Sequence, residues 1–327
     1  MGFLFVSLVL AASACSGSGS GLRTPAMAPS SAQYAAAPGR LLQRRIASAG
    51  VSPIRHIVIV IQENRTFENV FHGYPGAHTV TQGSDSNGKP VTLQPIHLMT
   101  PYDPAHRYHD WLTEYNRGGM NGFNNEILDY GKHAPPDFAY AYAMRSDVRP
   151  YWEMAANGTL SDATFADHRS PSFAGHQFPI AGASGPISND LPLYYAAENP
   201  RSGTDCSAPG PGSAINIETG AEDRTYMSCF TYATIADLLN AKSRTWAYYV
   251  PRSDRNSGVN GFAAIKSVRF GPQWKTNIIS PETQLFTDIG NGKLANVTYV
   301  VGQFVNSDHA GQNVPSSNGP AWVKRVE

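Results

Sequence analysis

Three short apolar segments predict the strands of a buried sheet. Arg55–Ile61 is a nearly continuous run of β-branched residues without polar alternation, which is typical of a strand covered by helices on both faces. Thr245–Val250 and Asn296–Val305 are further strand candidates. Helical patterns lie between the strands, and this alternation predicts a three-layer α/β/α sandwich with a mainly parallel sheet.

Two helical patterns are clear, and a long region between them is not. Thr66–Phe71 places its apolar side chains on one face, and in Thr231–Ala241 the side chains of Ile235, Leu238 and Leu239 should face the core. Residues 76–230, which lie between the two helices, are rich in Gly, Pro, Asn and His and show little periodicity. We interpret them as long loop insertions that carry substrate contacts.

Polar residues follow two of the predicted strands. Gln62–Arg65 comes directly after the first strand, and Asn306–His309 ends the third. Open α/β sheets bind their ligands outside the carboxyl ends of the strands. The pattern therefore predicts a functional site at this edge, with a polar cap on the following helix as the alternative role for Glu63 and Asn64.

The N-terminal segment predicts export. Phe3–Ala14 is an apolar run too short to span a bilayer, and small residues and Cys15 follow it. Ala12–Cys15 resembles a bacterial lipoprotein cleavage box, with lipid attached at the cysteine, and an ordinary secretory signal is the alternative. We expect residues 1–22 to lie outside the fold and residues 23–50 to form a flexible tether. The protein would then be periplasmic, secreted or membrane-anchored in a bacterium.

The charge balance argues against nucleic acid as a partner. The 327-residue chain carries 25 basic and 25 acidic side chains, so its formal net charge is zero. Charged residues make up only 15% of the chain, beside 30 Gly and 24 Pro, while 41% of the residues are hydrophobic. This composition is typical of a loop-rich globular enzyme.

Two cysteines predict a disulfide. Once Cys15 is set aside, Cys206 and Cys229 remain, separated by a polar, Gly-rich segment. In an oxidising compartment such a pair favours a disulfide, worth roughly 3 kcal/mol in the chain-entropy model. A metal site is the weaker interpretation because no third or fourth soft ligand lies nearby in the sequence.

Several segments of the sequence form a set that is specific to one family. His56–Gly73 (HIVIVIQENRTFENVFHG) spans a predicted strand, a turn and a helix. The further segments are His109–Trp111, Asn116, Gly119–Phe123, Ser172–Gln177, Ile279–Gln284 and Asn306–His309. Together they resemble the bacterial phosphoesterase family, whose opening signature His56–Gly73 matches and which contains phosphatidylcholine-type phospholipases C and acid phosphatases of alkaline-phosphatase-like fold. The resemblance runs from about residue 54 to the end of the chain, so residues 51–327 are expected to form one phosphoesterase domain.

The resemblance implies a role for individual residues. Glu63 and Asn64 would bind a divalent metal, Ser172 would attack phosphorus, and His109 and His309 would lie around the phosphate. Hard oxygen ligands at the end of a strand suit Mg²⁺, Ca²⁺ or Mn²⁺. An unassisted serine is a poor nucleophile, so Ser172 needs the metal or a nearby base. Asp308 is either a further metal ligand or a residue that orients His309.

Alternatives remain for most of these positions. Some relatives use a threonine as nucleophile, which makes Thr164 a rival of Ser172. Ser172 could also be an ordinary loop or cap serine. With 10 histidines in the chain, His109 and His309 could be structural, and the second-rank candidates are His106, His168 and His176.

The chain also departs from the family pattern. Family members continue into another helix and strand that end in paired aspartates of the metal site, whereas this sequence ends at Trp322–Glu327, inside the expected helix. Asn121 stands where the family has an aspartate. Two hypotheses follow. The first is an exported metal-dependent hydrolase of phospholipid head-group esters or small phosphomonoesters. The second is an inactive, C-terminally incomplete remnant that at most binds phosphate-bearing ligands.

Overall fold

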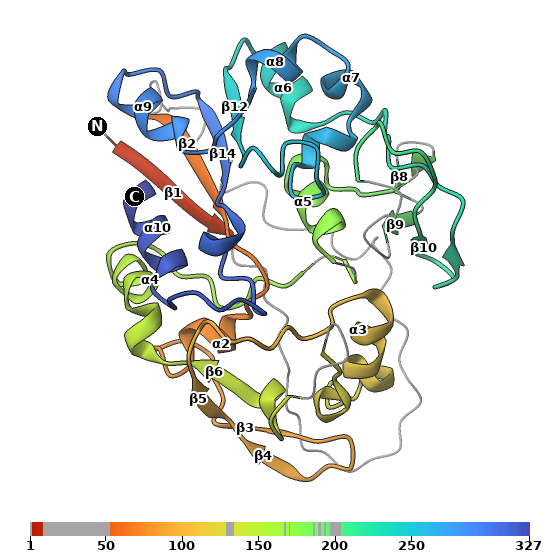
Figure 1. Ribbon diagram of the computed structural model, residues 1–327, viewed down its shortest axis with the longest axis vertical. Coiled ribbons are helices and arrows are strands. Elements are labelled where there is room, and N and C mark those ends of the chain that lie inside the picture. The colour runs from red at the N-terminus through yellow and green to blue at the C-terminus, as the bar shows by residue number, and fades with distance from the viewer. Residues whose placement is uncertain are drawn as a thin grey trace, which may run out of the picture.

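The computed structural model describes residues 2–8, 53–128, 134–166, 168–169, 171–185, 187–188, 191–192, 194–196 and 204–327. Its centre is a five-stranded sheet in which every neighbouring pair is parallel. The strands follow the order β1 (Gly2–Leu8), β2 (Ile54–Ile61), β14 (Val297–Val301), β12 (Trp246–Tyr249) and β13 (Ile278–Ile279). Figure 1 shows β1, β2 and β14 side by side near the left of the molecule.

Helices cover both faces of this sheet. One core cluster joins it to α5 (Ser172–Ala181), α6 (Ile235–Ala241) and α7 (Lys266–Arg269). A second cluster joins the opposite face to α4 (Arg145–Asn157), α9 (Gln284–Gly290) and α10 (Asn318–Val326). The predicted three-layer α/β/α sandwich with a mainly parallel sheet is therefore confirmed.

The burial of β2 explains its sequence. Its Ile59 and Ile61 pack into the first cluster, while Val58 and Val60 pack into the second. A strand covered on both faces has no side that favours polar residues, so the apolar run is nearly continuous.

The remaining elements are short helices and small sheets outside the central sheet. The short helices are α2 (Phe67–Phe71), α3 (Tyr108–Tyr115) and α8 (Gln273–Thr276). Small sheets pair β3 (Gln82–Ser84) with β4 (Pro90–Thr92), β5 (Gln94–Ile96) with β6 (Ala141–Ala143), and β7 (Ile187–Ser188) with β8 (Leu191–Pro192). A three-stranded sheet contains β9 (Tyr194–Ala196), β10 (Ala214–Asn216) and β11 (Glu222–Asp223).

Three details differ from the sequence prediction. Helix α6 begins only at Ile235, and Leu238 is 64% exposed rather than facing the core. Strand β14 ends at Val301, and a 3-10 turn at Phe304–Asn306 follows. The region interpreted as insertions contains α4 and α5, which are parts of the two helical layers.

The N-terminal segment also differs from its expected separation from the fold. Gly2–Leu8 pairs in parallel with β2 as the outer strand of the sheet. Without it β2 would expose a row of unpaired backbone groups, and an apolar strand satisfies such an edge. The proposed tether and Cys15 lie outside the described residues, and the export role of residues 1–22 stays a prediction.

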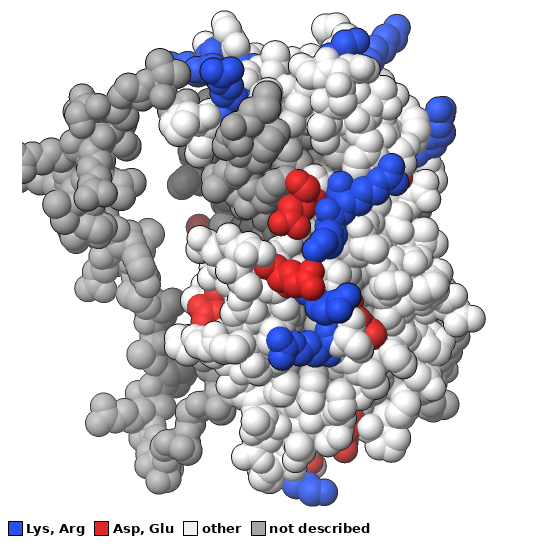
Figure 2. Space-filling model, turned by 90° about the vertical axis from the view of Figure 1, so that its left-hand side faces the viewer, with Lys and Arg blue, Asp and Glu red and all other residues white. Residues whose placement is uncertain are grey.

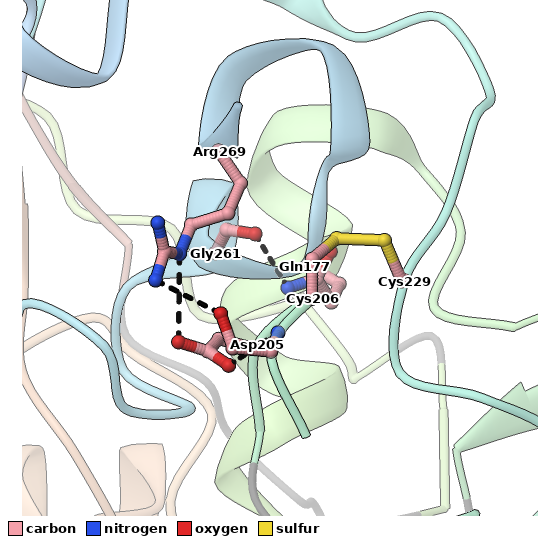
Figure 3. The surroundings of a disulfide bond; sticks show 7 residues. Gln177, Asp205, Cys206, Cys229, Gly261 and Arg269 are labelled. Carbon is pink, nitrogen blue, oxygen red and sulfur yellow. Dashed lines mark hydrogen bonds and ion pairs between the residues drawn. A yellow bond between two sulfur atoms is a disulfide. The ribbon is translucent and has the colours of Figure 1, made fainter. Parts of the chain in front are cut away.

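A disulfide joins Cys206 to Cys229, which confirms the predicted pair. Figure 3 shows it beside α5 and an ion pair between Asp205 and Arg269, whose closest atoms are 3.5 Å apart. The backbone N–H of Cys206 donates to the carbonyl of Ala263 at 3.0 Å. The disulfide therefore ties the loop that contains Cys206 to the segment of Cys229, next to the helical layer that carries α5.

Removal of this bond should weaken the fold. We expect Cys206→Ser combined with Cys229→Ser to lower the free energy of unfolding by about 3 kcal/mol, because the unfolded chain regains the entropy of an open loop. Urea denaturation of the two proteins measures the difference. A thiol reductant should destabilise the wild type and leave the double variant unchanged. Equal stability of both proteins under oxidising conditions would contradict this role of the disulfide.

The surface shows mixed charge on the face that Figure 2 displays, where acidic and basic side chains lie next to one another. An example from α4 and α10 is Lys324, whose ammonium lies 2.8 Å from a carboxylate oxygen of Glu153. None of the helices in the described part of the chain combines the length and apolarity needed to cross a bilayer.

Candidate active site

The polar segment after β2 forms a tight turn at the carboxyl edge of the sheet. Asn64 adopts a left-handed backbone conformation with φ of 58°, which asparagine tolerates better than most residues. The N–H of Glu63 donates to the carbonyl of Ser307 at 2.9 Å. This bond brings the segment after β14 next to the end of β2, as expected for neighbouring parallel strands.

Helix α5 supplies Ser172 at its first position. The helix is held close to the 3-10 turn at Gly261–Ala264, where the side-chain amide of Gln177 donates to the carbonyl of Gly261 at 2.7 Å. A Cβ atom at residue 261 would lie 2.3 Å from the carbonyl oxygen of His176. Glycine is therefore required there for α5 to approach, and this approach sets the position of Ser172.

Glu63 is the centre of a hydrogen-bonded triad. The hydroxyl of Ser172 donates to its Oε2 at 3.1 Å, and Nε2 of His176 lies 3.1 Å from its Oε1. The side chain of His176 is only 3% exposed and that of Glu63 only 11%. Ser172 and His176 are four residues apart on one helix and so lie on the same face. The structure thus brings both predicted residues, Glu63 and Ser172, into direct contact.

These contacts keep the Glu63 carboxyl ionised. Burial would raise its pKa, but the hydrogen bond and charge of His176, the charge of His309 and the hydrogen bond from Ser172 lower the pKa to about 2. A carboxylate of so low a pKa is a weak proton acceptor. It is better suited to binding a cation or orienting Ser172 than to taking a proton from it.

A cavity of about 430 Å³ opens beside this triad. Glu63, Ser172 and His309 line it together with Phe304 and Ser307 from the segment of His309, and with side chains from two other loops: Thr204, Ser253, Asp254 and Ser257. The side chains that meet here come from segments far apart in the sequence. The cavity lies at the carboxyl ends of β2, β12 and β14, where ligands bind in open α/β sheets.

Two histidines lie near each other at this edge. His309 is 9% exposed, and its ring centroid lies 5.4 Å from that of His106. Nδ1 of His309 is 2.8 Å from the carbonyl oxygen of Ala310, which leaves Nε2 as the nitrogen available for other contacts. The amide nitrogen of Asn64 lies 3.4 Å from Nε2 of His106. His106, ranked second from the sequence, therefore lies beside Asn64 and His309.

Asp308 belongs to a buried network instead of the cavity wall. Its carboxyl accepts hydrogen bonds from the hydroxyl of Tyr151 and, at 3.3 Å, from the amide of Gln62. Burial raises its pKa to about 6, although Tyr151, Arg65 and Gln62 favour the ionised form. Its neighbours Ser307 and His309 both line the cavity. Its contacts with Tyr151 and Gln62 involve neither His309 nor Glu63, so both predicted roles of Asp308, as a metal ligand and as a residue that orients His309, stay predictions.

The other sequence candidates lie elsewhere in the described structure. His109 on α3 is 64% exposed, and its Nε2 is 3.6 Å from a carboxylate oxygen of Glu222. The hydroxyl of Thr164 is exposed and lies 2.6 Å from that of Ser161. His168 stacks on Phe178 with ring centroids 4.7 Å apart. These contacts do not involve Glu63 or the cavity.

The oxygen atoms beside the cavity are of the chemical type that a hard divalent cation prefers as ligands. Glu63 is ionised, the hydroxyl of Ser172 is within hydrogen-bonding distance of it, and Asn64 is adjacent in the chain. Within the described ranges no cluster of three or more His, Cys, Asp or Glu side chains has metal-binding geometry. A cation held here would complete its coordination with water and phosphate oxygens, as Mg²⁺ commonly does.

Comparison with known proteins identifies the family of the chain. The model of the Phosphoesterase family matches residues 54–327, and the chain belongs to this family. The hemolytic phospholipase C of Pseudomonas aeruginosa is 21% identical to it over 310 residues. That alignment covers 86% of this chain and 40% of the relative, so the chain spans about two fifths of the relative's length. Family and relative together support hydrolysis of phosphoric esters as the class of chemistry.

Proposed function

We propose that the protein hydrolyses phosphate esters with Ser172 as its nucleophile and a divalent cation bound at Glu63 and Asn64. The observation that carries this proposal is the 3.1 Å contact between the Ser172 hydroxyl and the ionised Glu63 carboxylate at the rim of the cavity. Membership of the Phosphoesterase family supports the same chemistry.

Different residues of the chain would carry out different parts of this reaction. Ser172 Oγ releases its proton to water and forms a bond to phosphorus while the bond from phosphorus to the alcohol oxygen breaks. Because Ser172 lies at the start of α5, phosphoryl oxygens bound to it would lie near the positive end of the helix. His309, which lines the cavity, donates to the phosphate or to the departing oxygen. Water then hydrolyses the phosphoserine.

The cation has a limited role in this account. Glu63, Asn64 and Ser172 would hold it, with Mg²⁺, Ca²⁺ and Mn²⁺ as the candidates that match oxygen donors. A divalent ion bound by these residues would neutralise phosphate charge and favour release of the serine proton to water. His176 keeps the Glu63 carboxylate oriented through its 3.1 Å contact.

The substrate class follows from the relative. The similarity to a phospholipase C supports a phosphodiester, including the head-group ester of a phospholipid, as the substrate. The disulfide between Cys206 and Cys229 supports an exported protein, since such bonds persist in oxidising compartments. The N-terminal apolar run supports the same location, with a lipid anchor at Cys15 as one form of it.

Turnover with and without metal tests the proposal. The metal-loaded protein should hydrolyse p-nitrophenyl phosphate or a p-nitrophenyl phosphodiester. Dialysis against a chelator should abolish the reaction, and addition of Mg²⁺, Ca²⁺ or Mn²⁺ should restore it. p-Nitrophenyl acetate is the control substrate and should not respond to the metal. Turnover that survives complete metal removal, or no turnover of any phosphate ester, would refute the proposed function.

A further inference from the structure

A second cavity of about 430 Å³ adjoins the one that contains Ser172. Its walls come from the segments that follow β12, β13 and β14, so it lies at the same carboxyl edge of the central sheet. Ser253 and Phe304 line both cavities. A ligand bound at Ser172 could therefore extend past these two side chains into the second cavity, to which the proposed phosphate chemistry gives no role.

Arg252 gives the second cavity a positive charge. It is exposed and lines this cavity but not the first. Among the residues that the structure describes, no acidic side chain pairs with its guanidinium. Arg255, three residues later, differs: it donates to the carbonyl of Ile278 at 2.7 Å, and its guanidinium lies over the ring of Trp274 at 5.0 Å from the centroid. The donors of Arg252 are therefore available to a ligand, whereas those of Arg255 serve the fold.

The carboxylates lie on the other side of the shared wall. Asp254 lines the first cavity but not the second, and its two oxygens accept hydrogen bonds from the hydroxyls of Ser253 at 3.1 Å and Ser257 at 3.4 Å. Arg252 is the one charged side chain among the described residues that line the second cavity. An anionic group would therefore be bound more favourably in the second cavity than beside Asp254.

The other walls of the second cavity suit a carbon chain that ends in such an anionic group. Phe304 and Val305 are 54% and 39% exposed, and Pro281 adds further apolar surface. The exposed amide of Gln303 adds a neutral donor. A planar guanidinium forms paired hydrogen bonds with the oxygens of a carboxylate or phosphate. The cavity thus combines apolar walls for the chain with a cation for its end.

We propose that the second cavity binds one arm of a phosphodiester whose phosphorus faces Ser172, and that Arg252 selects an arm with an anionic group at its end. The inference rests on the proposed function for the position of the phosphorus. It adds a binding site for the arm, the charge that the arm carries and the residue that recognises this charge.

Two substrates of equal size test this selection. p-Nitrophenyl 4-carboxybutyl phosphate carries a carboxylate at the end of one arm, and p-nitrophenyl 4-carbamoylbutyl phosphate carries a neutral amide there. The wild type should favour the carboxylate by about tenfold in kcat/KM, the gain expected from one charge-assisted contact at an exposed site. Arg252→Gln should bring the ratio close to one through a higher KM for the carboxylate substrate. Arg244→Gln is the matched control: it removes the same charge from an exposed position before the amino end of β12 and should keep the wild-type ratio.

Three results would overturn the assignment: a wild-type ratio near one, an unchanged ratio in Arg252→Gln, or an equal fall of the ratio in Arg244→Gln, which would trace the preference to net charge alone. If the wild type hydrolyses neither diester, the proposed function fails, and calorimetric titration with hexanoate and with hexanamide still decides whether the second cavity binds anions. Hexanoate should bind the wild type more tightly than hexanamide does, and Arg252→Gln should remove the difference. Equal binding of the two by the wild type would contradict the inference.

Discussion

Replacing Ser172 by alanine should lower the turnover of a phosphate ester by a factor on the order of 10³ or more, because loss of a nucleophile leaves only binding and electrostatic effects. The substitution removes a hydroxyl that contacts Glu63 at the first position of α5, where alanine is compatible with the helix. The fold should therefore be retained. Steady-state kinetics with p-nitrophenyl phosphate and a p-nitrophenyl diester, alongside circular dichroism, measures both.

Thr164→Ala is the matched control for this experiment. Both variants lose one hydroxyl, but Thr164 is exposed, and its hydroxyl forms a hydrogen bond with that of Ser161. Its removal should leave kcat/KM within about twofold of the wild type, as surface substitutions usually have small effects. Loss of activity in Thr164→Ala with retention in Ser172→Ala would reverse the assignment of the nucleophile.

Glu63→Gln should remove the divalent cation while preserving the shape of the site. The amide keeps the size of the side chain and can still contact Ser172 and His176, but it lacks the charge that a hard cation requires. We expect the metal content to fall from about one ion per chain to near zero, and kcat to fall by about 10²-fold or more. Inductively coupled plasma analysis of dialysed protein measures the first effect.

The stability of Glu63→Gln distinguishes the role of Glu63 as a metal ligand from its role as a hydrogen-bond partner of Ser172 and His176. The carboxylate is nearly buried, so its replacement by a neutral amide should not unfold the protein. Folded Glu63→Gln with unchanged metal content would contradict the assignment of Glu63 as a ligand. Asn64→Ala offers a second check, since loss of one amide ligand should weaken the metal and not abolish it.

The buried sheet could be predicted from the sequence because its strands are covered on both faces. The run Arg55–Ile61 falls within β2 almost residue for residue. Helix α5 could not be found in the same way. Phe173–Gln177 is buried on every side, and Pro179 lies inside the helix, so the segment has neither an amphipathic period nor a typical helical composition.

The site was only partly predictable. The resemblance to the family identified Glu63 and Ser172, and the structure brings them together. The spacing from Ser172 to His176 is a sequence signal for their proximity, since residues four apart share one face of a helix. The sequence contains no comparable pattern that predicts the contacts of Asp308. Its partner Tyr151 is 157 residues away in the chain, and no local pattern reports a contact of that kind.

For His109, the sequence match does not correspond to a position beside the cavity. Its neighbours in the sequence match a family segment, yet its side chain is 64% exposed beside Glu222. A local match gives the residue types around a histidine and not the direction of its side chain. His106, three residues earlier, turns toward Asn64 and His309 instead.

The most direct test of the central claim is to find the phosphoryl group on the enzyme. Acid quenching during turnover of a phosphate ester, followed by proteolysis and mass spectrometry, should yield a peptide with one phosphate on Ser172. The same peptide from Ser172→Ala should be unmodified. Phosphate on Thr164 or on a histidine, or full turnover with no phosphorylated peptide in repeated quenches, would contradict a serine nucleophile at the start of α5.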